Sequence, residues 1–145
     1  WFEENSTPYA DALFQSGLLL AGAKNYQIST VGLNDGLLTA SEIQAMFLEN
    51  TQLVVLSATE TGADKNAADK GVFGLQRAFM TAGADQLLMS LWKADNEAKQ
   101  LFFTTFYKEW IQKGEEISEA FSAARKSVRK KYKHPYYWGA FVLID

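Results

Sequence analysis

Hydrophobic and polar residues alternate between two kinds of segment along this chain. Short apolar runs bounded by glycine or polar residues predict buried strands, and longer segments with apolar residues at helical spacing predict amphipathic helices. Because strands separated by helices require right-handed crossovers, the pattern predicts an α/β fold with a largely parallel sheet. The predicted strands are residues 16–21, 53–57, 86–91 and 138–144, the predicted helices are residues 40–48, 72–82, 96–113 and 117–130, and residues 61–71 are a predicted polar loop.

Residues at the ends of these segments support the predicted helices. Thr39 and Glu42 have the spacing of a capping box, which opens the helix that follows. Gly83 and Gly114 stand where two helices are expected to stop. Ser118 is expected to cap the last helix.

Composition and charge place the chain among ordinary globular proteins. It has 145 residues, about one domain, with 48% hydrophobic and 21% charged residues. The formal charge of −3 gives no reason to expect contact with nucleic acid or with an anionic membrane. We interpret the one basic cluster, residues 125–133, as a solvated face whose cations favour a helix C-terminus. No apolar stretch reaches the length of a membrane span, and we expect a cytoplasmic protein.

Residues 53–62, Leu-Val-Val-Leu-Ser-Ala-Thr-Glu-Thr-Gly, form an apolar run that breaks into small and polar residues. This is typical of a buried strand that ends in a functional loop at the C-terminal edge of a parallel sheet. With other segments in the same order, it resembles the CHAT domain, a caspase-like family often fused to tetratricopeptide repeats. The resemblance covers nearly the whole chain; its other segments are residues 16–22, 35–43, 71–79, 82–84, 90–95, 106–107 and 134–143.

The resemblance implies a caspase-like three-layer sandwich, in which helices flank a mainly parallel sheet. We expect a single domain over residues 1–145 that lacks its N-terminal strands. The strand of residues 53–57 would be central in such a sheet, and a missing neighbour would leave it with an unpaired edge. We therefore expect the N-terminal remainder of the domain, or a partner chain, to complete the sheet.

The resemblance also implies a catalytic dyad, in which a cysteine thiolate attacks the peptide carbonyl and a histidine moves the protons. Thr59 stands at the cysteine position, and the histidine belongs to a His-Gly strand expected before Trp1. The chain has no cysteine, and a threonine hydroxyl is a far poorer nucleophile. We expect the C-terminal part of a cysteine endopeptidase domain, inactive as given. A non-catalytic module that binds peptides or proteins through the same cleft is the alternative, and an unrelated flavodoxin-like ligand-binding domain is a less favoured third interpretation.

Two further residues, Asp95 and Glu60, are candidates for the site, and His134 is not. In the caspase-like clan, the loop that carries Asp95 builds the pocket for the substrate residue before the scissile bond, where a carboxylate pairs with arginine or lysine. The competing interpretation is that Asp95 caps the helix from residue 96. Glu60 flanks Thr59 and is expected to line the same cleft. His134, the single histidine, precedes a proline, and we expect it to enter the last strand and pack against Trp138 rather than act as a base.

The remaining signals indicate neither a cofactor nor a metal. Residues 62–71 lack the glycine and lysine pattern of a phosphate-binding loop, and no cluster of histidine, cysteine and carboxylates suggests zinc. Trp92, Trp110 and Trp138 are expected to be packing residues. The expected partner is a peptide or protein substrate.

Overall fold

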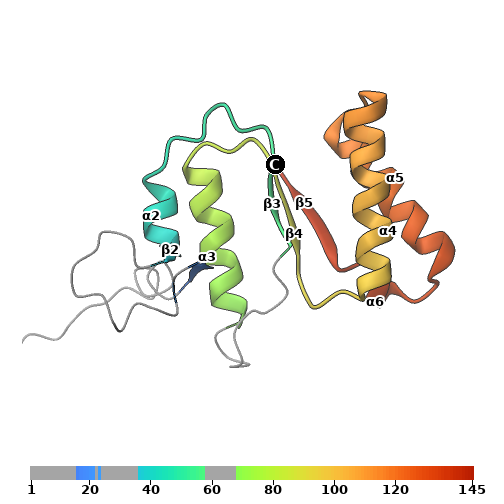
Figure 1. Ribbon diagram of the computed structural model, residues 1–145, viewed down its shortest axis with the longest axis horizontal. Helices are drawn as coiled ribbons and strands as arrows, with labels where there is room; N and C mark the ends of the chain where they lie inside the picture. Colours follow the sequence, from blue (N-terminus) through green and yellow to red (C-terminus); the bar gives the residue numbers. More distant parts are fainter. Residues whose placement is uncertain (1–15, 22, 24–35, 58–67) are drawn as a thin grey trace, which may run out of the picture. The chain divides into compact units, whose positions relative to one another are not determined.

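The computed structural model describes residues 16–21, 23, 36–57 and 68–145, with side chains from residue 74 onward in the last range. The chain divides into two compact units, and each is described by itself. The first unit comprises residues 1–52 and 61–85, and the second comprises residues 53–60 and 86–145. The described elements are mixed α and β (Figure 1). Among the described residues, no helix combines the length and the apolar character that a membrane span requires.

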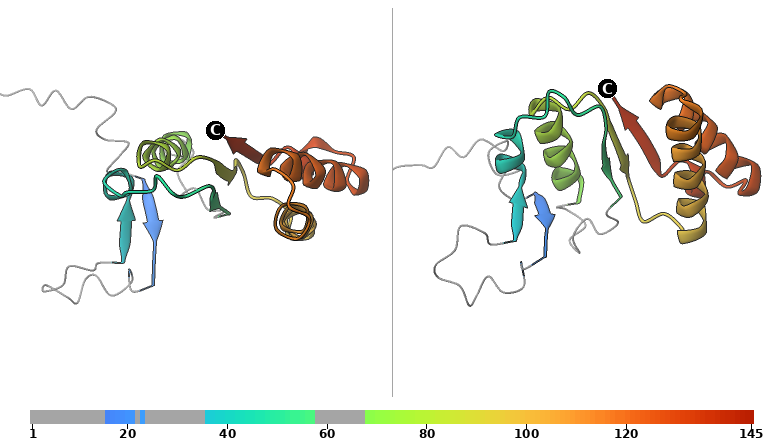
Figure 2. Two further views of the ribbon diagram at one scale, coloured as in Figure 1. Left: turned by 90° about the horizontal axis from the view of Figure 1, so that it is seen from above. Right: turned by 45° about the horizontal axis from the view of Figure 1, so that its top comes forward.

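The first unit contains a two-stranded antiparallel sheet. Strand β1 (Gly17–Leu19) runs against β2 (Leu37–Thr39), and Figure 2 shows the two arrows side by side in opposite directions. The prediction of a buried strand at residues 16–21 is wrong about burial, because the Leu19 side chain is 80% exposed. A strand with one partner, and without a covering layer on both faces, leaves alternate side chains in solvent.

Helix α2 (Ala40–Gln44) begins where β2 ends. The predicted capping box is confirmed: the Glu42 amide donates to the Thr39 hydroxyl at 3.2 Å, and the Thr39 amide donates to the Glu42 carboxylate at 2.8 Å. The helix is shorter than the predicted 40–48. After Ala45 the chain turns away, and the Leu48 amide donates to the Ala82 carbonyl.

Helix α3 (Ala68–Thr81) packs against α2. It begins before the predicted residue 72, so the loop predicted for 61–71 is wrong at its last residues, while 61–67 lie outside the described residues. The helix ends before Gly83, as predicted, and Gly83 has a φ of +101°. A Cβ atom there would lie 3.1 Å from the Glu49 backbone nitrogen, so both the backbone angle and the space require glycine.

The second unit contains a three-stranded sheet with the order β3-β4-β5. Strand β3 (Val54–Leu56) is parallel to β4 (Leu87–Ser90), with Leu56 opposite Met89. Strand β5 (Phe141–Ile144) is antiparallel to β4, with Ser90 opposite Phe141. All four residues of β4 are buried, as expected for the middle strand. Among the described strands β3 has a neighbour on one side, and the partner expected on its other side stays a prediction.

The expectation of a largely parallel sheet is wrong for the described strands, since one of the three strand pairs is parallel and two are antiparallel. The short helix α6 (Pro135–Trp138) explains the reversal in the second unit. It lies at the C-terminal end of β4, where the Tyr136 hydroxyl donates to the Lys93 carbonyl. The chain therefore enters β5 from the end at which β4 leaves, and it must run back.

Two long helices complete the second unit. Helix α4 (Asn96–Tyr107) continues into the π-helical turn η2 (Lys108–Gln112), and Gly114, with a φ of +74°, ends the segment as predicted. Helix α5 (Ile117–Lys131) packs against α4, and Figure 1 shows the two side by side. Its N-cap is Glu116, without a side-chain hydrogen bond, so the prediction that Ser118 caps this helix is wrong.

The core of the second unit lies between these helices and the sheet. Phe102 of α4 is fully buried and stacks on Phe141 of β5, with ring centroids 4.1 Å apart. Ala120 and Ala124 of α5 are also fully buried, and their small side chains leave room for the aromatic rings of α4. This packing holds the end of β4 and the start of α4 in a defined place.

Candidate functional site

The parallel pair β3 and β4 brings two chain segments to one edge of the sheet. Because Leu56 lies opposite Met89, the chain leaves both strands at the same edge, as the sequence pattern predicts. Ser57 follows β3 and is exposed, whereas Ser90 at the end of β4 is buried. The Ser90 hydroxyl donates to the Trp92 carbonyl at 2.6 Å, which turns the chain out of the strand.

Two of the predicted site residues come a few positions after β3 in the sequence. Thr59 and Glu60 both lie outside the described residues. Their placement at the cleft and their roles therefore stay predictions.

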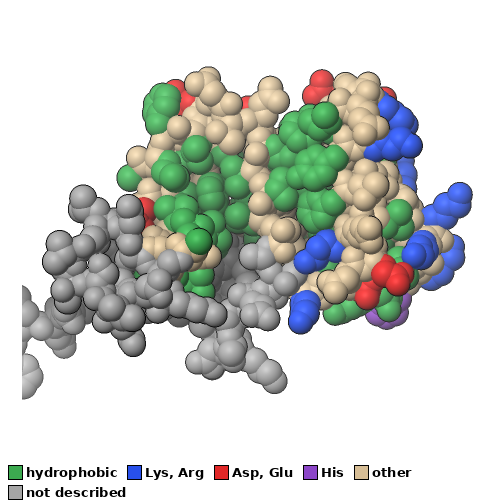
Figure 3. Space-filling model, in the orientation of Figure 1, with side chains coloured by type: hydrophobic (Ala, Val, Ile, Leu, Met, Phe, Trp, Pro, Cys, Tyr) green, Lys and Arg blue, Asp and Glu red, His purple; other side chains and the backbone are tan. Residues whose placement is uncertain are grey.

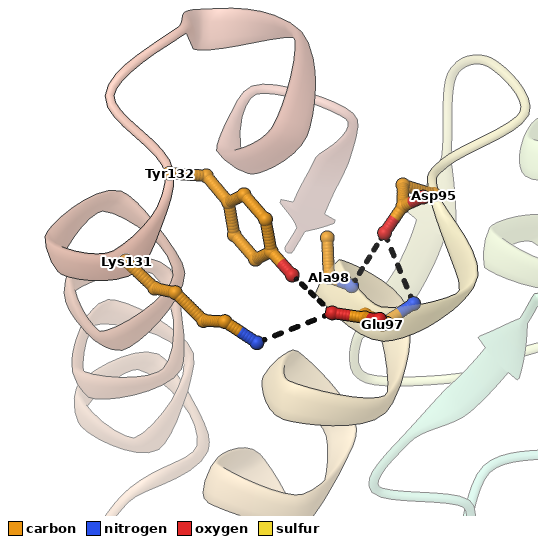
Figure 4. A network of polar contacts seen from close by, with 5 residues as sticks. All are labelled: Asp95, Glu97, Ala98, Lys131 and Tyr132. Carbon is orange, nitrogen blue, oxygen red and sulfur yellow. Dashed lines mark hydrogen bonds and ion pairs between the residues drawn. The ribbon is translucent and has the colours of Figure 1, made fainter.

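Asp95 caps helix α4. Its Oδ1 atom accepts hydrogen bonds from the Glu97 amide at 3.0 Å and from the Ala98 amide at 3.1 Å (Figure 4). The capping interpretation is thus confirmed, and the carboxylate lies at the positive end of the helix dipole. Asp95 is exposed, and within the described part of the chain its Oδ2 atom makes no hydrogen bond. This oxygen is therefore available to a cationic ligand group.

A second carboxylate ties the beginning of α4 to the end of α5. Glu97 accepts hydrogen bonds from the Tyr132 hydroxyl at 2.9 Å and from Lys131 Nζ at 3.3 Å (Figure 4). The hydrogen bond from Tyr132, followed by the contacts with Lys131, lowers the pKa of the Glu97 carboxyl. The contact with Tyr132 has the largest effect and raises the pKa of the Lys131 ammonium group, and the hydrogen bond with Glu97 raises it further. Because all three groups lie near the surface, solvent screens these contacts and their main effect is to align the two helix ends.

The loop between β4 and α4 is clamped to α6 by two aromatic residues. Trp92 Nε1 donates to the Tyr136 carbonyl at 3.0 Å, and the Tyr136 hydroxyl donates to the Lys93 carbonyl at 2.9 Å. The two rings stack with centroids 6.1 Å apart. Both remain open to solvent, with 37% of Trp92 and 47% of Tyr136 exposed. These contacts tie the loop that precedes Asp95 to α6 while it presents an aromatic surface.

This aromatic pair differs from what the sequence predicts. Trp92 was expected among the packing residues, yet it lies at the surface beside the sheet edge. Tyr136 was not among the predicted site residues. Its signal in the sequence is the cluster of three aromatic residues after Pro135. Helical periodicity does not reveal which of those three rings faces solvent.

His134 has a capping role. Its backbone is extended, as expected before proline, but it precedes helix α6, so the predicted strand entry is wrong. Its Nδ1 atom accepts from the Tyr136 amide at 3.2 Å, and the residue is exposed. The expected packing of His134 against Trp138 stays a prediction. The ring of Trp138 lies beneath the guanidinium groups of Arg125 and Arg129.

The described part of the sheet edge has the chemistry of a recognition surface. It combines a rigid loop, two exposed aromatic rings and a free carboxylate oxygen on Asp95. Aromatic faces and carboxylates both attract the cationic side chains of arginine and lysine. Among the described residues, no group of three histidine or carboxylate side chains is placed to hold a metal ion.

Comparison of the sequence with known proteins finds one matching family and two relatives. The family model of the CHAT domain matches residues 6–145. Tetratricopeptide repeat protein 28 of Homo sapiens is 38% identical to this chain over 114 residues, which cover 77% of the chain and 4% of that protein. The protein of the same name from Mus musculus is 35% identical over 114 residues, with the same coverage. The chain thus spans a small part of the length of these relatives.

Proposed function

Because the chain belongs to the CHAT domain family, which is caspase-like, we propose that it is a protease-derived domain without cysteine endopeptidase activity. Cleavage by a caspase-like protease requires a thiolate that attacks the peptide carbonyl. The observation that carries the proposal is that none of the 145 residues is cysteine, and that the resemblance places Thr59 at the nucleophile position. The proposal therefore rests on the missing cysteine alone and does not depend on the sequence before Trp1, where the histidine of the dyad is expected.

The chemical difference between the two side chains is large. A free cysteine has a pKa of about 8.5, so a few per cent of it is the nucleophilic thiolate at neutral pH, and nearby cations increase that fraction. A threonine hydroxyl needs an adjacent base to become reactive, such as the free terminal amine of the threonine itself. Thr59 is internal in the sequence and does not carry such an amine.

The test compares the full-length protein with its Thr59→Ala and Thr59→Cys variants on fluorogenic peptides that differ in the residue before the scissile bond. We expect the natural protein and Thr59→Ala to be equally inactive. Cleavage by the natural protein that disappears in Thr59→Ala would overturn the proposal. Labelling of Thr59→Cys by iodoacetamide reports whether the position is accessible in the folded protein.

Peptide binding is the second candidate function, and the sheet edge supports it. Trp92 on the clamped loop and Tyr136 on α6 present exposed rings, and Asp95 has one carboxylate oxygen that no described group hydrogen-bonds. A pre-organised loop loses little conformational entropy on binding, which favours affinity. Such a surface fits an extended peptide that carries an arginine or lysine side chain.

The Thr59→Cys variant distinguishes the two candidates. If it cleaves peptides, the domain keeps the remaining protease machinery and is an inactivated endopeptidase. If it stays silent, remains folded and still binds an arginine-containing peptide, the domain is a binding module. If the natural protein binds that peptide no better than a matched glutamine peptide, the binding function is refuted.

A further inference from the structure

The positive charge of this chain is concentrated in one short segment. Residues 125–133 hold six of the 14 lysine and arginine residues and no aspartate or glutamate. The other 136 residues carry eight basic and 17 acidic residues, a formal charge of −9. The cluster therefore stands out against an acidic chain. Its members are Arg125, Lys126, Arg129, Lys130, Lys131 and Lys133.

Four of these cations surround one shallow depression on the solvent side of α5. Lys126, Arg129, Lys130 and Lys133 line an open hollow of about 400 Å³, which we call the α5 basic hollow. No carboxylate is among its lining residues. The opposite face of α5 is buried against the core through Ala124 and Val128. Figure 3 shows lysine and arginine side chains gathered along the right-hand edge, where α5 lies in Figure 1.

Neighbouring acidic groups leave most of these charges uncompensated. Within the described part of the chain, Lys131 is the one member of the cluster with an ion pair, to Glu97. Arg125 and Arg129 instead lie over the ring of Trp138, at 5.4 and 5.3 Å from its centroid. A guanidinium group that stacks on an aromatic ring keeps its N–H donors free for carboxylates. The ring thus holds these donors in place before a ligand arrives, which reduces the entropy lost on binding.

The helix dipole explains part of the cluster. Cations are favourable within the last turn of a helix, and the basic residues 129–131 are in the last turn of α5. Lys126 lies more than one turn before the helix end, where this effect has faded. Like charges that gather without need on one face repel one another. A ligand of opposite charge would offset this repulsion.

From this arrangement we propose that the α5 basic hollow binds an acidic segment of a partner protein, through its aspartate and glutamate side chains. The spacing of the cations along α5 matches the spacing of side chains on an extended peptide. Lys126 and Lys130 are four residues apart on one helix, about 6 Å along its axis. Alternate side chains of an extended peptide are about 6.6 Å apart. Carboxylates at every second position therefore meet cations on successive turns of α5.

Charge and size favour a short acidic segment over nucleic acid. The three lining residues on α5, Lys126, Arg129 and Lys130, span about 6 Å along the helix axis, and Lys133 follows the helix end. Such a site is short for proteins that bind duplexes through many phosphate contacts. A long polyanion would also extend beyond the hollow and meet the net negative charge of the rest of the chain. A short peptide contacts the hollow alone. The proposal is independent of Thr59 and of the sheet edge.

The test measures fluorescence anisotropy of a labelled ten-residue peptide of alternating glutamate and serine, titrated with the full chain at two salt concentrations. We expect binding that weakens as salt rises. Arg129→Glu/Lys130→Glu should lower the affinity by about tenfold, because it converts two attractions into repulsions. The matched control, Lys108→Glu/Lys113→Glu, changes the net charge equally at the two ends of η2. It should change the affinity by less than about threefold.

Two further measurements complete the test. The neutral variant Lys130→Gln/Lys133→Gln removes charge without adding repulsion, and it should weaken binding while the circular dichroism spectrum stays unchanged. A peptide with lysine in place of glutamate should bind Arg129→Glu/Lys130→Glu better than it binds the natural chain. The proposal would be overturned if the control variant lost as much affinity for the glutamate peptide as Arg129→Glu/Lys130→Glu, or if neither hollow variant lost affinity. It would also be overturned if ten-nucleotide oligothymidine, or phosphatidylserine vesicles, bound at least as tightly as the glutamate peptide.

Discussion

Asp95 has one role that the structure shows and one that we propose, and two substitutions separate them. Its Oδ1 atom accepts from two backbone amides, of Glu97 and Ala98. Asp95→Ala removes this acceptor and leaves both donors without their partner. Because Ala98 is fully buried, water replaces the hydrogen bond to its amide poorly. We expect Asp95→Ala to lower the free energy of unfolding by about 1–2 kcal/mol.

Asp95→Asn keeps an oxygen that can accept the same hydrogen bonds, and asparagine caps helices about as well as aspartate. The variant loses the attraction between the carboxylate and the helix dipole, which is about 0.3–1 kcal/mol and lies at the low end for an exposed group. We therefore expect a loss of stability of about 0.5 kcal/mol or less. If Asp95 also binds a cationic side chain, the same variant should weaken binding of an arginine-containing peptide by about tenfold, since it removes a charge-assisted hydrogen bond.

Urea denaturation followed by circular dichroism measures the stability, and fluorescence anisotropy with an arginine peptide measures the affinity. Glu116→Ala is the matched control, because Glu116 is the N-cap of α5 but makes no side-chain capping hydrogen bond. It should cost only a few tenths of a kcal/mol. An Asp95→Ala variant as stable as Glu116→Ala would refute the capping argument. An Asp95→Asn variant with unchanged affinity would remove Asp95 from the binding site.

Two further predictions concern the described helices. Gly83→Ala should lower the free energy of unfolding by about 1 kcal/mol or more beyond the loss caused by Gly114→Ala. Both glycines have a positive φ, but only a Cβ atom at position 83 would crowd the Glu49 backbone. Equal losses of stability in urea denaturation would contradict this prediction. For Glu97, the folded-state pKa lies below its ordinary value of 4.5, so its contribution to stability is complete above that pH and is lost as pH falls through the folded-state pKa. As the pH falls from 5 to 3, roughly the range in which carboxyl groups titrate, the free energy of unfolding of Glu97→Gln should therefore decrease less than that of the natural chain. If both proteins lose the same free energy over this range, the hydrogen bond from Tyr132 to Glu97 does not contribute to stability.

The helices were largely predictable because their signals are local. The capping box of Thr39 and Glu42 and the helix ends before Gly83 and Gly114 depend on residues a few positions apart. The error at Ser118 is one of position along the chain. Several residues near a helix start can act as caps, and α5 has Glu116 as its N-cap without a side-chain capping hydrogen bond.

The strand directions and the surface of the site were not predictable in the same way. The sequence predicts that residues 138–144 form a strand, but α6 takes the first of them, and β5 returns antiparallel to β4. That reversal depends on hydrogen bonds between Trp92 or Lys93 and Tyr136, which are more than 40 residues apart in the sequence. The exposure of the Trp92–Tyr136 pair follows from the same contacts.

By itself, the sequence determines that this is a CHAT domain of mixed α and β structure that has no cysteine and therefore no thiolate. These properties belong to residue types and their order, so they hold before the chain folds. The tertiary structure decided that β5 runs antiparallel to β4, that the rings of Trp92 and Tyr136 stack and face solvent, and that Glu97 meets the end of α5. Those properties depend on which distant segments meet, because burial and charge proximity arise only when the helices pack against the sheet and against one another.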